Sequence, residues 1–432
     1  MNFSKPNRLP PACIATFAAI ITLASLSHAL DLGDFSVNGY YKNYSVAINE
    51  PEIDDPWFQG IVHPMIGAVS NRLRLDLRGR LKDWLSFNTA YDFSPRIQDR
   101  SLFYYNSISV GLIQSDYRAF DLRPRLYPGE GERAASFAIF QNLDRAFLSF
   151  RTNFADFYLG RQPIAWGSAR VVNPTDVLAP YAFDELDVED RRGVDAIRMR
   201  LPIGFMGEVD AGYVFGDDFK SENNAMFLRT KLYYRGNDIS LILCGFRENL
   251  LLGFDLARSL GGAGFWLETG YVVVGALDSA DEPDDQDYFR LSIGSDYSLR
   301  DGTYLFAEYH YNQAGASNPD EYLLGVTQTA YREGAVYLMG EHYLAPGVSY
   351  QITPLIFATG QVLLSLTDQS VFTLPRIEYN IAENIYLSAG ANLGFGNGPY
   401  IQHVSEFIEI IKLQSEFGSY SDSYFTSFRI YF

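Results

Sequence analysis

From residue 34 onward the chain alternates apolar and polar residues in short segments that end at turn residues. Between Asn71 and Arg80, leucines and charged residues occupy alternate positions. A period of two is typical of a β-strand with one apolar face and one polar face. We count about eighteen such segments, each of about ten residues. Their expected spans are 34–47, 68–81, 84–95, 141–152, 155–166, 192–202, 205–216, 225–235, 238–247, 250–259, 263–276, 286–297, 302–313, 335–350, 355–366, 370–380, 384–394 and 421–432.

The connections between these segments alternate between tight turns and long loops. The turns include Lys82-Asp83, Gly261-Gly262 and Thr353-Pro354, and the long connections are 48–67, 96–140, 167–191, 217–224, 277–285, 314–334 and 395–420. Outer-membrane barrels have short periplasmic turns, long extracellular loops and an even strand number. The fold class predicted is therefore all-β: a transmembrane antiparallel β-barrel of about 18 strands with both ends in the periplasm.

Two further features favour a barrel in a membrane. No segment after residue 29 has the pattern of a membrane helix, and lipid admits only helices or closed barrels, because an unpaired backbone group there costs several kcal/mol. In the last segment, Phe428, Ile430 and Phe432 share one face, with Ser427 and Arg429 on the other. A final strand that ends in Phe432 resembles the strand recognised by the barrel assembly machinery, which we expect as a partner.

The first residues have the form of a secretory signal. Lys5 and Arg8 precede an apolar stretch over 12–26, and Ser27-His28-Ala29 is a small-x-small cleavage site. We expect cleavage after Ala29, which leaves a single barrel domain over 30–432 in the outer membrane of a Gram-negative bacterium. The alternative is an N-terminal anchor, but the stretch is shorter than the roughly 20 residues that span a bilayer.

Charge and cysteine content exclude several classes of protein. The formal net charge of −18 becomes −20 when Lys5 and Arg8 leave, which argues against a nucleic-acid partner. Cys244 is the one cysteine after residue 29, so a disulfide framework is impossible and an inert wall residue is expected. Acidic clusters at 52–55, 184–190 and 281–285 fall in predicted outer loops, where most of the negative charge should be solvated. We expect no cofactor, although these loops could bind Ca²⁺ or contact lipopolysaccharide through divalent ions. The spacing in 406–416 predicts a short helix.

The alternation also assigns residues to the inward face. Leu73, Leu75 and Leu77 face lipid, because a charge at the midplane of the lipid face would cost about 2–4 kcal/mol. The inward candidates for lining a pore or contacting substrate are Arg72, Arg74, Asp76, Arg78, Arg80, Arg145, Arg151, Arg198, Arg200, Arg229, Lys231, Arg290, Glu308, Arg376, Glu378 and Arg429. In four of these strands Asp76 is the one acid expected among the cations, so one sector should be basic. Pairing with acids on neighbouring strands is the alternative.

Guanidinium groups bind carboxylates and phosphates, and basic rings favour anions. The hypothesis is a channel for anionic or sugar-like solutes.

The loop over 96–140 is long enough to fold into the barrel and narrow it. It combines aromatic and basic residues, and Tyr117, Arg118, Arg123 and Arg125 are the candidates for a constriction. Aromatic rings stack on sugars and arginines bind anions, while packing of the loop against the wall is the alternative.

Residues 158–200 suggest a family. The family-like positions are Gly160, Arg161, Gln162, Trp166, Asn173, Pro174 and Asp176, followed by the returning strand at Gly193. This stretch resembles the alginate-export-type outer-membrane barrels and related porin-like proteins. The resemblance implies an eighteen-strand monomeric channel lined with arginines. The chain is shorter than expected for an alginate exporter, and carboxylates dilute its basic lumen. Alternation places Leu159 and Arg161 on one face, so a bulge at Gly160 or Pro163 would be needed to turn Arg161 inward.

Other functions remain open at this point. Export of an anionic polysaccharide is the second transport hypothesis, and a surface adhesin is another. An outer-membrane enzyme would need a catalytic set, yet the histidines after residue 29 are only His63, His310, His342 and His403, with no Ser-His-acid spacing. His310 and Glu308 share an inward face, where a hydrogen bond within the wall is expected. No His/Cys cluster predicts a metal site.

Overall fold

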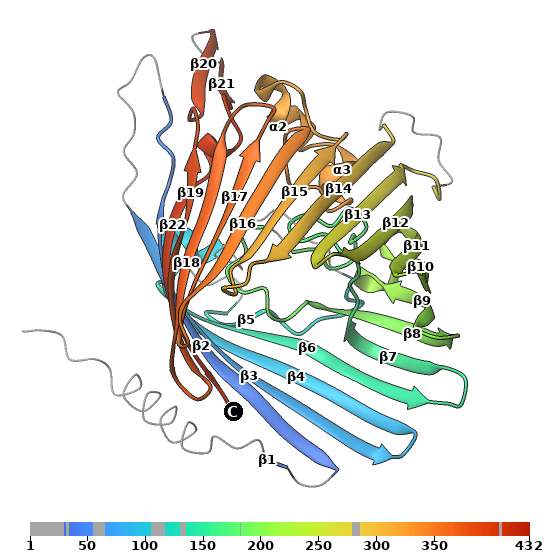
Figure 1. Ribbon diagram of the computed structural model, residues 1–432. Helices are drawn as coiled ribbons and strands as arrows, with labels where there is room; N and C mark the ends of the chain where they lie inside the picture. The colour runs from blue at the N-terminus through green and yellow to red at the C-terminus, as the bar shows by residue number, and fades with distance from the viewer. Residues whose placement is uncertain are drawn as a thin grey trace, which may run out of the picture.

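The computed structural model describes residues 30–31, 34–54, 65–104, 117–129, 135–181, 183–278, 286–405 and 408–432. These residues form a closed antiparallel barrel of 18 strands (Figure 1). The predicted signal at residues 1–29, the acidic cluster at 281–285 and His63 lie outside the described residues.

Each barrel strand pairs with its neighbours, and the first strand closes the ring by pairing with the last. The barrel strands are β2 (Phe35–Asn49), β3 (Ile66–Lys82), β4 (Leu85–Gln98), β6 (Phe137–Arg151), β7 (Asp156–Pro163), β8 (Gly193–Ile203), β9 (Gly207–Phe215), β10 (Ala225–Tyr234), β11 (Asn237–Phe246), β12 (Asn249–Leu260), β13 (Ala263–Val273), β14 (Tyr288–Ser298), β15 (Tyr304–Asn312), β16 (His342–Thr353), β17 (Ile356–Ser365), β18 (Val371–Ala382), β19 (Ile385–Phe395) and β22 (Asp422–Tyr431). At the seam, the Phe432 N–H donates to the Gly39 carbonyl at 2.9 Å and the Gly39 N–H to the Phe432 carbonyl at 2.8 Å.

The predicted strand pattern is confirmed, with local differences. β7 ends at Pro163 instead of 166, and β16 begins at His342 instead of 335. The helix predicted over 406–416 is wrong. That region holds β20 (Tyr400–Ser405) paired with β21 (Ile408–Lys412), a hairpin beyond the barrel rim (Figure 1). Its isoleucines are β-branched residues that favour strands, and this preference outweighs the helical spacing.

The remaining elements are short. They are β1 (Leu30–Asp31), β5 (Arg125–Tyr127), α2 (Tyr322–Gly325), α3 (Thr329–Arg332) and the 3₁₀ turns η1 (Arg100–Tyr104), η2 (Asp217–Phe219), η3 (Ser221–Asn223), η4 (Pro319–Glu321) and η5 (Phe417–Ser419). Within the described part of the chain, no helix is long and apolar enough to cross a membrane.

The strands carry apolar side chains on the outside and a packed interior on the inside. Leu75, Leu228 and Leu241 are exposed on the outer face, as lipid requires. The largest buried apolar cluster joins inward side chains of β8–β14 to residues of the β7–β8 connection. The barrel interior is therefore partly filled by its own chain, and Figure 1 shows these green segments inside the ring of strands.

Candidate functional site

The connection between β7 and β8 enters the lumen and crosses it. We name residues 164–192 the lumen segment. Its first part buries Ile164, Trp166 and Leu178 in the large apolar cluster, where the Trp166 ring lies 4.9 Å from that of Phe227 on β10. The Trp166 indole N–H donates to the Thr175 carbonyl at 2.8 Å, which closes a compact turn. This part of the lumen is a protein core and not a water-filled pore.

Two buried glutamates of the wall bind the backbone of this segment. Glu308 on β15 accepts the N–H groups of Arg170 at 2.6 Å, Val171 at 3.2 Å and Val172 at 3.0 Å. The Trp266 indole also donates to Glu308, at 2.8 Å. Consecutive backbone N–H groups form a favourable binding site for an anion, and here the carboxylate of Glu308 on β15 occupies that site.

Glu268 on β13 holds the next turn in the same way. It accepts the N–H groups of Ser168, Ala169 and Thr175, each at 3.0 Å. The Asn173 amide adds a bond at 3.1 Å. We name residues 164–179 the anchored limb, since its apolar side chains and backbone N–H groups are both bound by the wall.

Arg290 and His310 also serve this packing. Arg290 was predicted to line the pore, but it is buried and donates to the carbonyls of Pro174 at 2.8 Å and Ala335 at 3.3 Å. Glu308, another predicted pore residue, is the anchor described above. The expected bond between Glu308 and His310 is also absent from the described contacts, because His310 Nδ1 pairs with Ser292 Oγ at 2.9 Å. Ser292 donates to the Val172 carbonyl at 2.6 Å, so this buried Ser–His pair is structural.

The returning part of the segment carries the acidic cluster, which we name the acidic limb, residues 184–190. It lies inside the barrel, so the expectation that these acids are solvated in an outer loop is wrong. Lys42 on β2 lies 2.8 Å from Asp187 and 2.6 Å from Glu189. Arg72 on β3 lies 3.1 Å from Asp187. Burial alone would raise the pKa of Asp187, but Lys42 and Arg72 hold this pKa below its usual value.

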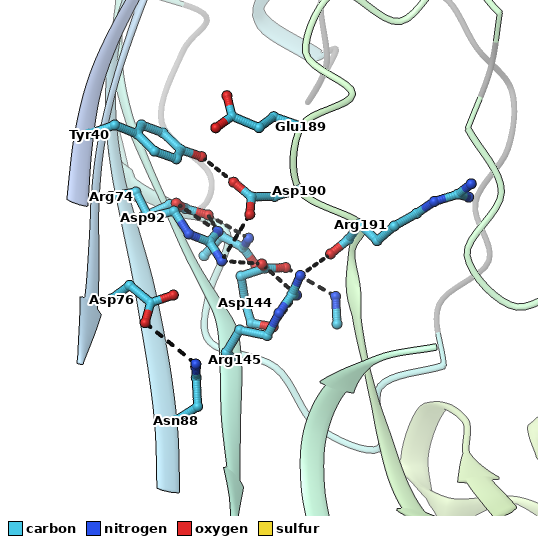
Figure 2. Close-up of polar contacts among 12 residues, drawn as sticks. Tyr40, Arg74, Asp76, Asn88, Asp92, Asp144, Arg145, Glu189, Asp190 and Arg191 are labelled. Atoms are coloured by element: carbon cyan, nitrogen blue, oxygen red, sulfur yellow. Dashed lines mark hydrogen bonds and ion pairs between the residues drawn. The ribbon is translucent and has the colours of Figure 1, made fainter. Parts of the chain in front are cut away.

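Arg74 lies at the centre of this network (Figure 2). Its guanidinium is 3.4 Å from Asp92, 2.9 Å from Asp144 and 3.7 Å from Asp190. Arg145 lies 2.6 Å from Asp144 and donates to the Arg191 carbonyl, also at 2.6 Å. Cations of the wall thus meet acids of both the wall and the lumen segment.

The expected basic sector is neutralised, because acids beyond Asp76 reach its cations. Arg78 pairs with Asp76 at 2.8 Å and Arg80 with Asp34 at 2.7 Å. The other ion pairs are Arg151–Asp156, Arg198–Asp210, Arg200–Glu208, Arg229–Glu208, Lys231–Asp238 and Arg429–Glu378. Arg376 lies over the Phe425 ring at 5.2 Å. Pairing with acids on neighbouring strands, the alternative that the sequence left open, accounts for most of these ion pairs, whereas the acids of the lumen segment were not expected inside the barrel.

Position along the barrel separates the predicted pore residues. Arg74 and Arg145 are buried under the lumen segment. Toward the short-turn end, the side chains of Arg78, Arg80 and Arg151 are 61%, 62% and 78% exposed. We name these three the mouth arginines; each is paired with an acid and largely exposed to solvent.

The predicted constriction loop has another role in its described part. Residues 117–129 bridge β6 and β8 at the level where β7 leaves the wall: Gln141 N–H donates to the Pro124 carbonyl at 2.9 Å, and Asp195 N–H to the Tyr117 carbonyl at 2.9 Å. Arg118 pairs with Asp121 at 2.6 Å. Arg123 and Arg125 belong to the same stretch, and Arg125 Nε donates to the Pro128 carbonyl at 3.1 Å. The described stretch extends the wall, and the lumen segment fills the interior instead.

The family-like motif holds this junction together. Gly160 adopts φ +115°, and an added Cβ would lie 2.3 Å from the Ala146 carbonyl. Arg161 lies 2.8 Å from both Asp195 and Asp121, and its burial excludes it from a pore surface. Gln162 donates to the Ala196 carbonyl at 3.2 Å.

Further along the motif, Asp176 binds Arg191 at 2.6 Å, which ties the anchored limb to the residue that follows the acidic limb. Burial raises the pKa of Asp176, and Arg191 opposes the shift.

Sequence reasoning missed Lys42, Tyr40 and the lumen segment itself. Around Lys42 both faces of the strand are polar, so alternation carries no information. The sequence of β11 did indicate that the lumen is filled, because most residues of Ser240–Phe246 are apolar on both faces of the strand. An apolar inward face in a barrel indicates that protein, and not water, lies against it.

Comparison with known proteins supports the fold. No family model matches the chain, and no curated protein matches it. Among solved structures, a BenF-like porin from Pseudomonas fluorescens Pf-5 aligns with TM-score 0.53 and 10% identity, covering 93% of this chain and 99% of that one. OccAB2 and OccAB4 from Acinetobacter baumannii give TM-scores of 0.55 and 0.52 with 8% and 9% identity, covering 92% and 91% of this chain and 98% of each of theirs. The chain thus has the porin-type barrel fold. A closed barrel of this size with an apolar exterior is an outer-membrane protein of a Gram-negative bacterium.

Proposed function

We propose that this protein is an outer-membrane channel for anionic or sugar-like solutes. The observation that carries the proposal is the exposure of the mouth arginines, Arg78, Arg80 and Arg151, on the inward face near the short-turn end. Exposed ion pairs of this kind contribute only about 0–1 kcal/mol. A carboxylate or phosphate of a solute can therefore replace Asp76 or Asp34 at little cost, and guanidinium binds either group in a bidentate manner.

The test is ion selectivity in planar bilayers with the refolded protein. At about 0.1 M salt, where screening acts over about 10 Å, the wild type should pass chloride in preference to potassium. Replacing Arg78, Arg80 and Arg151 together with Ala should lower this preference by about twofold or more. Arg235→Ala is the matched control, because Arg235 is an exposed arginine of the β10–β11 turn that lies outside the ion pairs described above. Cation selectivity of the wild type, or an unchanged preference in the triple variant, would contradict the proposal.

Export of an anionic polysaccharide is supported less well. A polymer must thread the whole lumen at once, whereas the anchored limb is held by two buried glutamates and the apolar cluster. A small solute needs only a local path beside that limb. We therefore favour small solutes. The resemblance of residues 158–200 to alginate-export barrels concerns the conformation in which β7 leaves the wall, and it does not identify the transported solute.

A further inference from the structure

The two limbs of the lumen segment are held by different physical means. The anchored limb contributes large apolar side chains to the core and its N–H groups to Glu268 and Glu308. The acidic limb contributes one apolar side chain, Leu186, which packs at the edge of a small cluster. Most of its described contacts are charged or hydroxyl groups, and these are the contacts that another anion can replace.

The wall facing the acidic limb has the composition of an anion-binding site. Besides the Lys42 and Arg72 pairs, the Tyr40 hydroxyl donates to Asp190 at 2.7 Å and the Tyr431 hydroxyl donates to Glu189 at 2.7 Å. Figure 2 shows Tyr40 and Arg74 directed toward Asp190 from the wall. Three carboxylates within four residues are thus bound by donors from β2, β3 and β22.

Lys42 indicates that the site depends on the limb. Arg72 and Arg74 have Asp92 as a partner from the wall itself. The carboxylates that pair with Lys42 in the described structure, Asp187 and Glu189, both belong to the limb, and its side chain is fully buried beneath them. If the limb moved away, this ammonium group would face the lumen without a partner, so an anion would be drawn into its place.

We propose that the acidic limb is an internal ligand of a polycarboxylate-binding site formed by Tyr40, Lys42, Arg72, Arg74 and Tyr431, and that a compact di- or tricarboxylate solute passes by replacing it. This inference rests on the proposed channel function and names its substrate class. The exchange is feasible because the incoming carboxylates restore the same ion pairs, while the released limb regains water around its charges. The two remaining acids of the limb, Asp184 and Glu185, form no ion pair among the described residues, and burial raises the pKa of both, so their return to water is favourable as well.

The experiment uses citrate as the probe and follows backbone hydrogen exchange by mass spectrometry. Saturating citrate should accelerate exchange in residues 184–190 by at least about tenfold, and leave residues 164–179 unchanged. Sodium chloride at matched ionic strength controls for screening. Lys42→Gln should abolish the citrate effect. Limb amides that stay protected in saturating citrate would overturn the proposal.

Competition supplies a second and independent readout. A ligand that must displace an internal competitor binds with reduced apparent affinity, so removing the competitor tightens binding. The variant Asp187→Asn/Glu189→Gln/Asp190→Asn should bind citrate at least about tenfold more tightly in calorimetry. The matched control is Asp184→Asn/Glu185→Gln, which removes two carboxylates of the same limb that do not pair with Lys42, Arg72 or Arg74, and should change the affinity by less than about threefold. Equal effects of the two variants would show general electrostatics and refute an internal ligand.

The two proposals fail in different ways. Anion-selective conductance with a limb that never moves would leave the channel intact and remove the internal ligand. Citrate-driven release of the limb in a protein without conductance would retain the binding site and remove the channel function.

Discussion

Replacing Glu308 with Gln should release the anchored limb. The carboxylate is 1% exposed and accepts three backbone N–H groups and the Trp266 indole. Glutamine keeps one acceptor oxygen, but its NH₂ group replaces the second carboxylate oxygen and would face N–H groups that also donate. Each bond to a charged acceptor contributes about 1.5–3 kcal/mol, and each buried donor left unpaired costs about 1–3 kcal/mol. Because these contributions are not additive, we expect a local loss of about 3–5 kcal/mol, as for a broken buried ion pair.

Hydrogen exchange of residues 168–175 measures this loss directly. Since about 1.4 kcal/mol corresponds to a factor of ten, exchange should accelerate by about 10² to 4 × 10³. The matched control is Glu378→Gln, which removes an inward wall carboxylate that binds Arg429 and lies outside the contacts of the lumen segment. Equal protection of the limb in the wild type and in Glu308→Gln would refute the idea that this carboxylate holds the segment.

Three further predictions concern the junction at β7 and the outer loops. Arg161→Lys should weaken the attachment of residues 117–129 by about 2–3 kcal/mol, because an ammonium group cannot donate at the same time to all the groups that the guanidinium binds. Trypsin should then cleave faster after Arg123. An unchanged cleavage rate would argue against this role of Arg161. Gly160→Ala should cost about 1–3 kcal/mol or more through its positive φ and the close Ala146 carbonyl, seen as a lower temperature at which the folded gel band is lost. Burial raises the pKa of Glu416 from 4.5 to about 7. The protonated carboxyl therefore contributes about 3 kcal/mol to the stability of the folded loops below about pH 4.5, and this contribution is lost as the pH rises through 7. Glu416→Gln should remove the decline in melting temperature between pH 4.5 and pH 7.

The strands were predictable because lipid enforces alternation. In β3 the exposed Leu75 and Leu77 alternate with Arg74 and Arg78. A slip of one residue would place arginines in hydrocarbon, so the register follows from local sequence alone. The contents of the lumen were less predictable, because they depend on which distant elements meet.

The acidic limb illustrates that limit. Residues 184–190 have the composition of a solvated loop, and local sequence offers no sign that Lys42 lies against them, about 145 residues away in the chain. Pairing of the arginines of β3, β6 and β8 with acids of neighbouring strands was an alternative that the sequence offered, but the sequence contained no sign that the lumen segment would add its own acids. The net charge of a lumen depends on all the strands and loops that meet in the closed barrel, and no single strand determines it.

The opposite charges of the two walls explain why the limbs of one segment can behave differently. The wall at β13 and β15 presents Glu268 and Glu308, which are buried and would lose their backbone N–H donors if the anchored limb left. An uncompensated buried carboxylate is strongly destabilising, so that limb stays. In the proposed exchange, Arg72 and Arg74 of the wall at β2 and β3 would keep Asp92 as a partner, and a solute anion would replace the acidic limb. If both proposals hold, the channel opens only on the side of β2 and β3, beside an anchored limb that remains fixed, and Lys42, Arg72 and the mouth arginines would line its path.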